Sequence, residues 1–216
     1  MKLNSKRTIL VGLAFLSICA FWQMYDSVVP LILTKTFHMN ETFSGAIMAA
    51  DNILALFLLP FFGSLSDRSH SKIGKRMPFI LFGTGCAVIL MNILPLLDNS
   101  YAAQPSGLKT ASFVIVLGLL LVTMGTYRSP AVALMPDVTP KPLRSRANAI
   151  INLMGAVGGI LYLGVAAVLY PNSKTAGLDH VNYQPLFIVV SAIMFIAIAV
   201  LCSGAAVALL WLKHLF

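Results

Sequence analysis

Residues 63–78 read Gly-Ser-Leu-Ser-Asp-Arg-Ser-His-Ser-Lys-Ile-Gly-Lys-Arg-Met-Pro, a short basic stretch between two long apolar runs. Each run is long enough to cross a bilayer, whereas the four Lys and Arg residues at positions 68–76 cannot lie in hydrocarbon. Loops on the translocated side of a membrane carry few Lys and Arg residues. We therefore expect residues 66–76 to form a cytoplasmic loop, which fixes the orientation of the whole chain.

The composition is that of an integral membrane protein, because 58% of the 216 residues are hydrophobic and only 10% are charged. The net charge of +8 does not indicate nucleic-acid binding, since the cations gather in short connections between apolar runs. The three cysteines lie singly within apolar runs, so we expect no metal site, cofactor or disulfide framework. We also expect no enzyme, because the cytoplasmic connections hold no nucleophile–base pair and no phosphate-binding glycine loop.

Six segments are long enough to span the membrane, which takes about 20 apolar residues. We expect helices at about 8–36, 42–65, 77–97, 111–136, 145–170 and 186–212. The predicted fold class is an all-α membrane protein with a single six-helix domain over residues 1–216. Six spans divided three plus three suit the inverted repeats that are common in transporters.

The distribution of basic residues predicts the topology. With the N-terminus inside, eleven of the 15 Lys and Arg residues fall in cytoplasmic segments and three in outer connections, while Arg128 lies within the fourth span. This asymmetry follows the positive-inside rule. We therefore expect a multi-pass protein of the cell membrane with both termini in the cytoplasm.

Polar residues within the spans are the candidates for function, because a charge at the bilayer centre costs about 2.5–3.5 kcal/mol on insertion scales. The first span holds Gln23 and Asp26, and Pro30 one turn later removes a helical hydrogen bond. Asp26 either lines a polar cavity beside this break or is hydrated near the outer interface. Asp51 and Asn52 in the second span leave the same choice open: they bind a proton or solute, or they are wetted at the interface.

Arg128 is the sharpest single signal, since a guanidinium keeps its proton in an apolar environment and therefore needs an anion. Asp26 and Asp51 are the acids available to it. The resulting pair either holds two helices together or forms a fork that grips solute hydroxyls and responds to protonation of its carboxylate. Tyr127 and, in the fifth span, Asn152 complete the candidate binding set.

Two further patterns are expected to be structural. The fifth span carries Gly155, Gly158 and Gly159, and small residues at such spacings favour close helix packing over binding. The four histidines fall in loops or at helix ends, where we expect hydrated side chains and not a proton relay.

The basic stretch resembles a known motif. Gly63-x-x-x-Asp67-Arg68-x5-Gly74-Lys75-Arg76 resembles the segment between the second and third helices of the major facilitator superfamily. The longer string from Leu59 to Ile80, and the segment Arg-Ser-Pro-x-x-x-Leu-x-Pro-Asp at 128–137, are similar to its sucrose/proton symporter-like and glycoside-pentoside-hexuronide:cation symporter branch.

The resemblance implies a secondary carrier that works by alternating access and moves a small polar solute, a sugar or glycoside, with a proton. It implies that Asp26 and Arg128 face the central cavity, and that the cytoplasmic gate consists of the motif residues Gly63, Asp67, Arg68, Gly74, Lys75 and Arg76. Sodium-coupled members of the glycoside branch carry acids in the second helix where this chain has Leu56 and Leu59. Proton coupling is therefore preferred to sodium coupling.

The superfamily normally has twelve helices, and six helices leave a polar cavity face that cannot lie against lipid. We therefore expect the chain to be the N-terminal half of a longer product or to pair with a second six-helix chain, including a second copy of itself. A non-transporting membrane partner or sensor that keeps the carrier fold is the alternative function.

Overall fold

The structure, a computed structural model, describes residues 4–71, 73–175, 177–178 and 180–213, and it is helical without a strand in these ranges. Six of its helices are long and apolar enough to cross a membrane, which confirms the predicted fold class. Those six are α1 (Ser5–Leu31), α2 (Glu41–Asp67), α3 (Met77–Ala103), α4 (Gly107–Val138), α5 (Arg144–Leu169) and α7 (Gln184–Lys213). The short elements are the π-helical turn η1 (Ile32–Thr36), the 3-10 turn η2 (Lys141–Leu143) and α6 (Asn172–Thr175).

The helix ends follow from local chemistry in most places. The side chains of Asn4 and Asn40 accept hydrogen bonds from backbone N–H groups in the first turns of α1 and α2, as helix caps do. Beyond Pro30 the first helix continues as the π-helical turn η1. The third helix differs from its prediction, because it runs to Ala103 and not to 97, so that Asp98 lies inside it.

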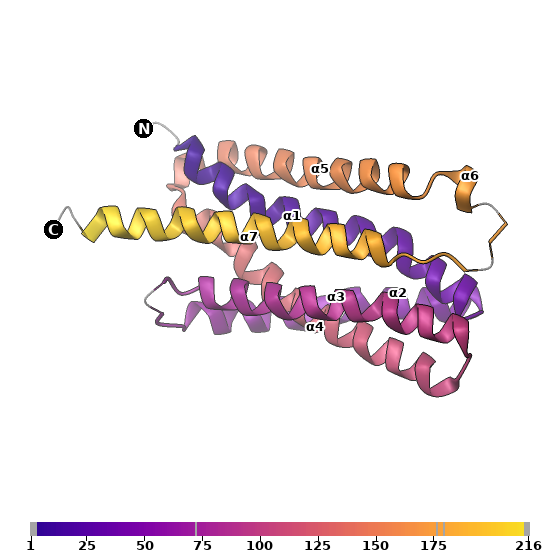
Figure 1. Ribbon diagram of the computed structural model, residues 1–216. Helices are drawn as coiled ribbons and strands as arrows, with labels where there is room; N and C mark the ends of the chain where they lie inside the picture. Colours follow the sequence, from indigo (N-terminus) through magenta and orange to yellow (C-terminus); the bar gives the residue numbers. More distant parts are fainter. Residues whose placement is uncertain (1–3, 72, 176, 179, 214–216) are drawn as a thin grey trace.

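The helices pack as two related triplets, with α1, α2 and α3 in one and α4, α5 and α7 in the other. The first helix of each triplet packs against the second and third helices of the other: α1 against α5 and α7, and α4 against α2 and α3. The third helices, α3 and α7, pack against each other. Exchanging the triplets therefore reproduces the pairing, as expected for a three-plus-three repeat. The start of α1 and the end of α7 lie at the same end of the bundle (Figure 1).

Close contact between α1 and α5 depends on glycine, as the sequence predicts. A Cβ added at Gly158 would lie 2.1 Å from the carbonyl oxygen of Leu16, and one added at Gly155 would lie 2.9 Å from Sγ of Cys19. At Gly158 the close atoms are backbone atoms of Leu16, so this position needs a residue without a side chain, while at Gly155 the Cys19 side chain would have to move. The predicted packing role of the fifth span is thereby confirmed.

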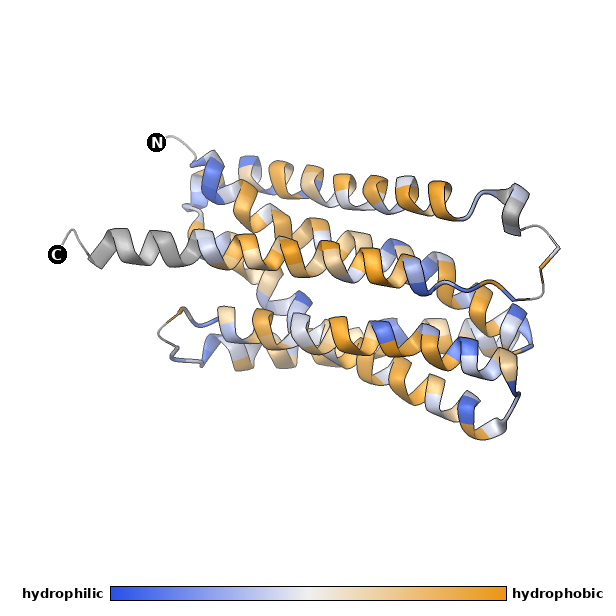
Figure 2. Ribbon diagram, in the orientation of Figure 1, coloured by the Kyte–Doolittle hydropathy of each residue, from blue (hydrophilic) through white to orange (hydrophobic). Residues whose placement is uncertain are grey.

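Burial differs sharply between the helices. The core contains large side chains from α1, α4 and α7, including Phe21, Tyr25, Phe113, Tyr127 and Phe187. In α2, by contrast, only Ser44 and Ser66 are buried, and apolar side chains such as Phe57 are exposed. Apolar residues occupy the middle of the long helices while hydrophilic residues gather toward the two ends (Figure 2). Such a surface suits a bilayer or a further helical partner.

Candidate functional site

Arg76 lies at the start of α3 and joins three neighbours through one buried guanidinium. Its Nε donates to Oδ2 of Asp137 at 2.6 Å, its Nη1 to Oγ of Ser66 at 2.8 Å, and its Nη2 to Oδ1 of Asp67 at 2.7 Å. Ser66 and Asp67 end α2, whereas Asp137 lies in the last turn of α4. A planar fork with several fixed donors suits this task, and it ties the ends of α2, α3 and α4 together.

The neighbouring motif residues support this arrangement. Nζ of Lys75 lies 3.4 Å from Oδ1 of Asp67 and 3.6 Å from Oδ2 of Asp137, so it adds a second cation between the same two carboxylates. Gly74 has φ of +100°, a backbone conformation that favours glycine. At Gly63 an added Cβ would lie 3.1 Å from Oγ of Ser129, which shows how closely α2 approaches α4.

Arg68 is the motif residue that stands apart. It follows α2 as the C-cap, its backbone N–H bonds to the Ser64 carbonyl, and its side chain is exposed. Within the described ranges its guanidinium forms no ion pair and no hydrogen bond. The network thus brings Asp67, Lys75 and Arg76 together and leaves Arg68 outside.

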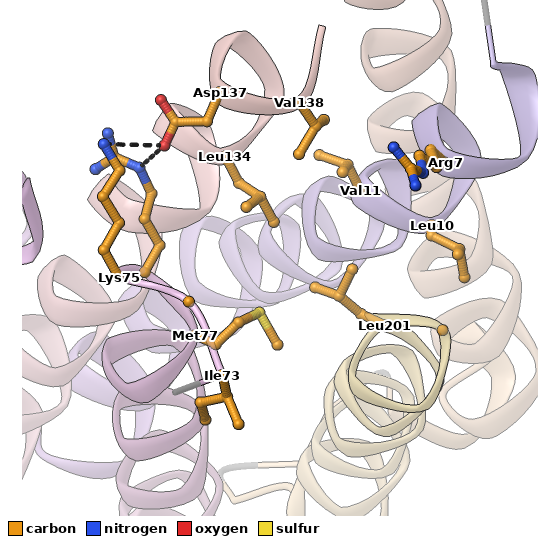
Figure 3. Close-up of a pocket in the computed structure, with 13 residues that line it drawn as sticks. Arg7, Leu10, Val11, Ile73, Lys75, Met77, Leu134, Asp137, Val138 and Leu201 are labelled. Carbon is orange, nitrogen blue, oxygen red and sulfur yellow. Dashed lines mark hydrogen bonds and ion pairs between the residues drawn. The ribbon is translucent and has the colours of Figure 1, made fainter. Parts of the chain in front are cut away.

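Beside this network lies a pocket of about 370 Å³ (Figure 3). It is formed by the first turns of α1, the loop before α3, the end of α4 and residues of α7. Its lining is mostly apolar, with Arg7, Lys75 and Asp137 among the charged residues. The network ties α2 to α4. The pocket separates the end of α4 from residues Leu201 and Gly204 of α7. We call this end of the bundle the gate end.

Arg128 does not form the ion pair that the sequence predicts. Among the residues that the structure describes, no carboxylate lies within 4.0 Å of its guanidinium. The guanidinium carbon lies instead 5.3 Å from the centroid of the Trp22 ring, in a cation–π contact. Such a contact stabilises a partly desolvated cation without an anion. Arg128 is half-buried and lines a small pocket together with Trp22 and Asp51. Of the two acids considered for it, Asp51 lines this pocket and Asp26 does not.

The other predicted binding residues lie on exposed faces of α1, α2 and α5. Gln23, Asp26, Asn52 and Asn152 are all exposed. Asp51 is half-buried, and its Oδ1 accepts hydrogen bonds from the Asn52 backbone at 2.6 Å and from the Asn52 side chain at 2.8 Å. The structure thus brings Asp51 and Arg128 into the lining of one pocket.

Comparison with known proteins assigns the fold to a family. A family model described as Major Facilitator Superfamily matches residues 11–214. The chain belongs to the major facilitator superfamily. It is therefore a multi-pass membrane protein, and its six spans are consistent with one half of that fold.

Several relatives carry names that state an activity. Sucrose transport protein SUC3 of Arabidopsis thaliana is 34% identical over 145 residues, which is 62% of this chain and 24% of that protein. Sucrose transport protein SUT3 of Oryza sativa subsp. indica is 33% identical over 141 residues, or 59% of this chain and 28% of that protein. Alpha-ketoglutarate permease of Escherichia coli (strain K12) is 26% identical over 168 residues, or 78% of this chain and 34% of that protein.

The chain thus aligns with about a quarter of the length of these sucrose transport proteins. The names agree with the expected branch of the superfamily and with the expectation that the chain is not an enzyme. They do not favour the alternative of a non-transporting sensor.

Tyr127, which the sequence places in the candidate binding set, lies in the core of the bundle. Its side chain is fully buried, and its hydroxyl donates to the Ala14 carbonyl at 2.9 Å and is also hydrogen-bonded to Oγ of Ser17. These bonds join α4 to α1 inside the core. In this structure Tyr127 is therefore a packing residue with no open surface toward a solute.

Two members of the gate network received no role from the sequence. Ser66 is fully buried between Gly63, whose carbonyl accepts its hydroxyl at 2.9 Å, and Arg76. Asp137 ends α4, far in sequence from the basic loop. Each had one available signal: Ser66 precedes the Asp-Arg pair directly, and Asp137 is an acid at the end of an apolar run. Neither signal shows that the two residues meet at one guanidinium.

Proposed function

We propose that this chain is one half of a secondary carrier that moves a sugar or glycoside together with a proton by alternating access. The observation that carries the proposal is the group of Arg128, Trp22 and Asp51 on three different helices within the membrane-spanning part of the bundle. A guanidinium and a carboxylate inside apolar helices cost free energy of insertion. Their presence at that cost therefore points to a function. The names of the sucrose transport relatives support a sugar as the solute.

The chemistry of this group suits a sugar. Arginine and carboxylate groups form charge-assisted hydrogen bonds with hydroxyls, and an indole ring offers an apolar face to a pyranose ring. Arg128 has no carboxylate partner among the described residues, so its donors are available to an incoming solute. Asn52, which is held against Asp51 by two hydrogen bonds, extends the same polar surface.

The proton would bind at the two acids of this surface. Asp26 is exposed on α1 and Asp51 is half-buried on α2, and two carboxylates that face one passage would repel each other when both are charged. A single proton on this pair would remove the repulsion. Solute bound at Arg128 would then change the field at Asp51, which lines the same pocket. Binding of solute and binding of the proton would thus be linked through Asp51.

The gate end would close the passage on the cytoplasmic side. The Arg76 network joins the ends of α2, α3 and α4 in this conformation, and opening requires its bonds to exchange for water. The distribution of basic residues supports a cytoplasmic gate end, with both termini on that side and the protein in the cell membrane.

The opposite wall of the passage would come from a second six-helix unit. Gln23, Asp26, Asn52 and Asn152 are exposed on α1, α2 and α5 at depths where lipid offers no hydrogen bonds. α2 has in addition a largely exposed apolar surface. The occupant would be the second half of a longer product or a second copy related by a two-fold axis along the membrane normal.

Transport in proteoliposomes tests the proposal, with the chain reconstituted alone and together with a C-terminal six-helix half of a related carrier. We expect sucrose or a glycoside to drive proton uptake, read from an internal pH dye. Arg128→Lys should lower this uptake at least tenfold, because an ammonium group cannot form the guanidinium fork. Asp26→Asn should abolish the coupled proton movement.

The matched controls are Arg146→Lys and Glu41→Gln, which alter exposed charges at the ends of α5 and α2. Both should transport as the parent does. Absence of sugar-dependent proton movement in every combination would contradict the proposal. So would an Asp26→Asn variant that still moves protons like the parent.

A further inference from the structure

Asp98 is a fully buried acid near the end of α3, at the opposite end from the gate. Neither carboxyl oxygen has a hydrogen-bond partner within the described part of the chain. Burying such a group as an unpaired anion costs several kcal/mol, so it must carry a proton or face a cation. The side chain that faces it is His180, whose Nδ1 lies 3.9 Å from Oδ2 of Asp98.

His180 comes from the connection between α6 and α7, and its hydrogen bonds fix where its protons lie. The Asn182 carboxamide oxygen accepts from the backbone N–H of Gln184 at 2.9 Å, which fixes the orientation of that amide. Nδ2 of Asn99 donates to the same oxygen at 2.9 Å. Oδ1 of Asn99 therefore points at Nε2 of His180, 3.0 Å away, and Nε2 must be the donor.

With Nε2 protonated, Nδ1 is the nitrogen that gains and loses a proton. In the neutral ring Nδ1 accepts a hydrogen bond from Thr36, whose Oγ1 lies 3.2 Å away. In the cation Nδ1 becomes a donor, and it already points to the side on which Asp98 lies. The geometry thus offers two places for one proton, Nδ1 of His180 and the carboxyl of Asp98.

We propose that Asp98 and His180 bind one proton between them and so form a latch that holds the α6–α7 connection against η1 and α3. The latch closes with one proton on the pair, as a neutral acid beside a neutral ring or as a carboxylate beside a cation. Loss of that proton leaves a buried carboxylate with no cation beside it among the described residues. The connection then separates and water reaches Asp98. His180 contacts Thr36 of η1 and Asn99 of α3, so both segments meet at this connection.

Other titratable groups near the pair do not supply the missing charge. Burial, together with Asp98 and two neighbouring tyrosines, raises the pKa of the Tyr183 phenol, so it stays neutral at physiological pH. Tyr170 packs against Tyr183 with the rings tilted by 43°, and its hydroxyl donates to the Asn182 carbonyl at 2.7 Å. Nζ of Lys109 donates to the carbonyl oxygens at 100 and 104, and Lys35 is exposed.

The sign of the pH effect follows from the proton count. The closed latch holds one proton more than the open one, so closure is favoured at low pH and is lost as pH rises. A single proton can change the closed-to-open ratio by at most tenfold per pH unit. This prediction replaces the expectation that all four histidines are merely hydrated.

Hydrogen–deuterium exchange of the purified chain in nanodiscs tests the latch, because it needs no transport. We expect peptides that cover residues 177–184 to exchange five- to a hundredfold faster at pH 7.5 than at pH 5.5, after correction for intrinsic rates. Asp98→Asn keeps the shape and leaves the His180 bonds to Thr36 and Asn99 possible. Because an amide cannot become the buried carboxylate that opens the latch, this variant should be as protected at pH 7.5 as at pH 5.5 and show no transition.

His180→Gln keeps Asp98 as the sole proton site, so its transition should move along the pH axis and not disappear. His70→Gln, an exposed histidine at the gate end, should behave as the parent does. Asp179 is the other acid beside His180 in the sequence, and Asp179→Asn should retain the transition. A parent without pH-dependent exchange would overturn the latch, as would a transition that survives in Asp98→Asn or an unmoved transition in His180→Gln.

Discussion

The gate network allows one energetic prediction to be worked from its distances and burial. Two cations face Asp137, and they differ in geometry. The Arg76 side chain is 6% exposed with Nε at 2.6 Å from Oδ2, whereas the Lys75 side chain is 44% exposed with Nζ at 3.6 Å from the same oxygen. A short hydrogen bond from a buried charged donor contributes about 1.5–3 kcal/mol. An ion pair between exposed side chains contributes about 0.2–1 kcal/mol.

Two double-mutant cycles measure these contributions separately. The first combines Arg76→Gln with Asp137→Asn, and the second combines Lys75→Gln with Asp137→Asn. Each cycle takes the free energy of unfolding in mixed micelles from denaturation with sodium dodecyl sulfate, and the non-additive part is the coupling energy. We expect about 1.5–2.5 kcal/mol for the Arg76 cycle, toward the lower part of the range because Asp137 is partly exposed. We expect less than about 1 kcal/mol for the Lys75 cycle.

The salt dependence gives an internal check. Raising the ionic strength to about 1 M should remove most of the Lys75 coupling and little of the Arg76 coupling, because screening acts mainly on exposed charges. Equal coupling energies in the two cycles, or a larger one for Lys75, would refute the reasoning from burial and distance. The stability of the network would then come from the summed charge at this end of the bundle and not from the hydrogen bonds of the Arg76 guanidinium.

Three further substitutions test the packing. Gly158→Ala should destabilise the bundle by about 1–3 kcal/mol through overpacking of α1 on α5, while Gly164→Ala, with open space around its Cβ position, should be close to neutral in the same unfolding assay. Tyr127→Phe should cost about 0.5–1.5 kcal/mol through loss of its hydroxyl bond to Ala14, and an unchanged stability would show that the bond is dispensable. Gly74→Ala should cost about 1–3 kcal/mol because of its positive φ, with Gly85→Ala as the helical control; equal effects would contradict the role of that backbone angle.

The sequence predicts best where a single segment carries the whole signal. Six apolar runs define six spans, and the basic loop after α2 forms an ion-pair network as its motif suggests. Asp98 shows where local reading fails. The run Asp98-Asn99-Ser100 has the composition of a loop, yet it is helical and Asp98 is buried. His180, which lies far along the chain, faces it from the α6–α7 connection, and no local pattern contains that contact.

Arg128 shows a second limit of sequence reasoning. The cost of a charge in the membrane correctly predicts that the guanidinium needs a favourable partner. It does not say whether that partner is a carboxylate or an aromatic face. Trp22 lies in the same helix as Asp26, one turn earlier, and the ring takes the place that the acid was expected to fill. The choice depends on how α1 is rotated against α4, which is set by contacts such as the hydroxyl bond of Tyr127 to Ala14.

The two ends of the bundle respond to different conditions because their cations differ. At the gate end the central cation is an arginine, which keeps its charge at every pH the protein meets, and its partners are carboxylates. At the opposite end the proposed latch is a histidine, His180, beside the buried acid Asp98, and it closes only when the pair holds a proton. A change of pH that removes this proton should therefore release the α6–α7 connection and leave the Arg76 network intact. In a carrier that alternates between its two ends, such a difference would let protons bias which end opens.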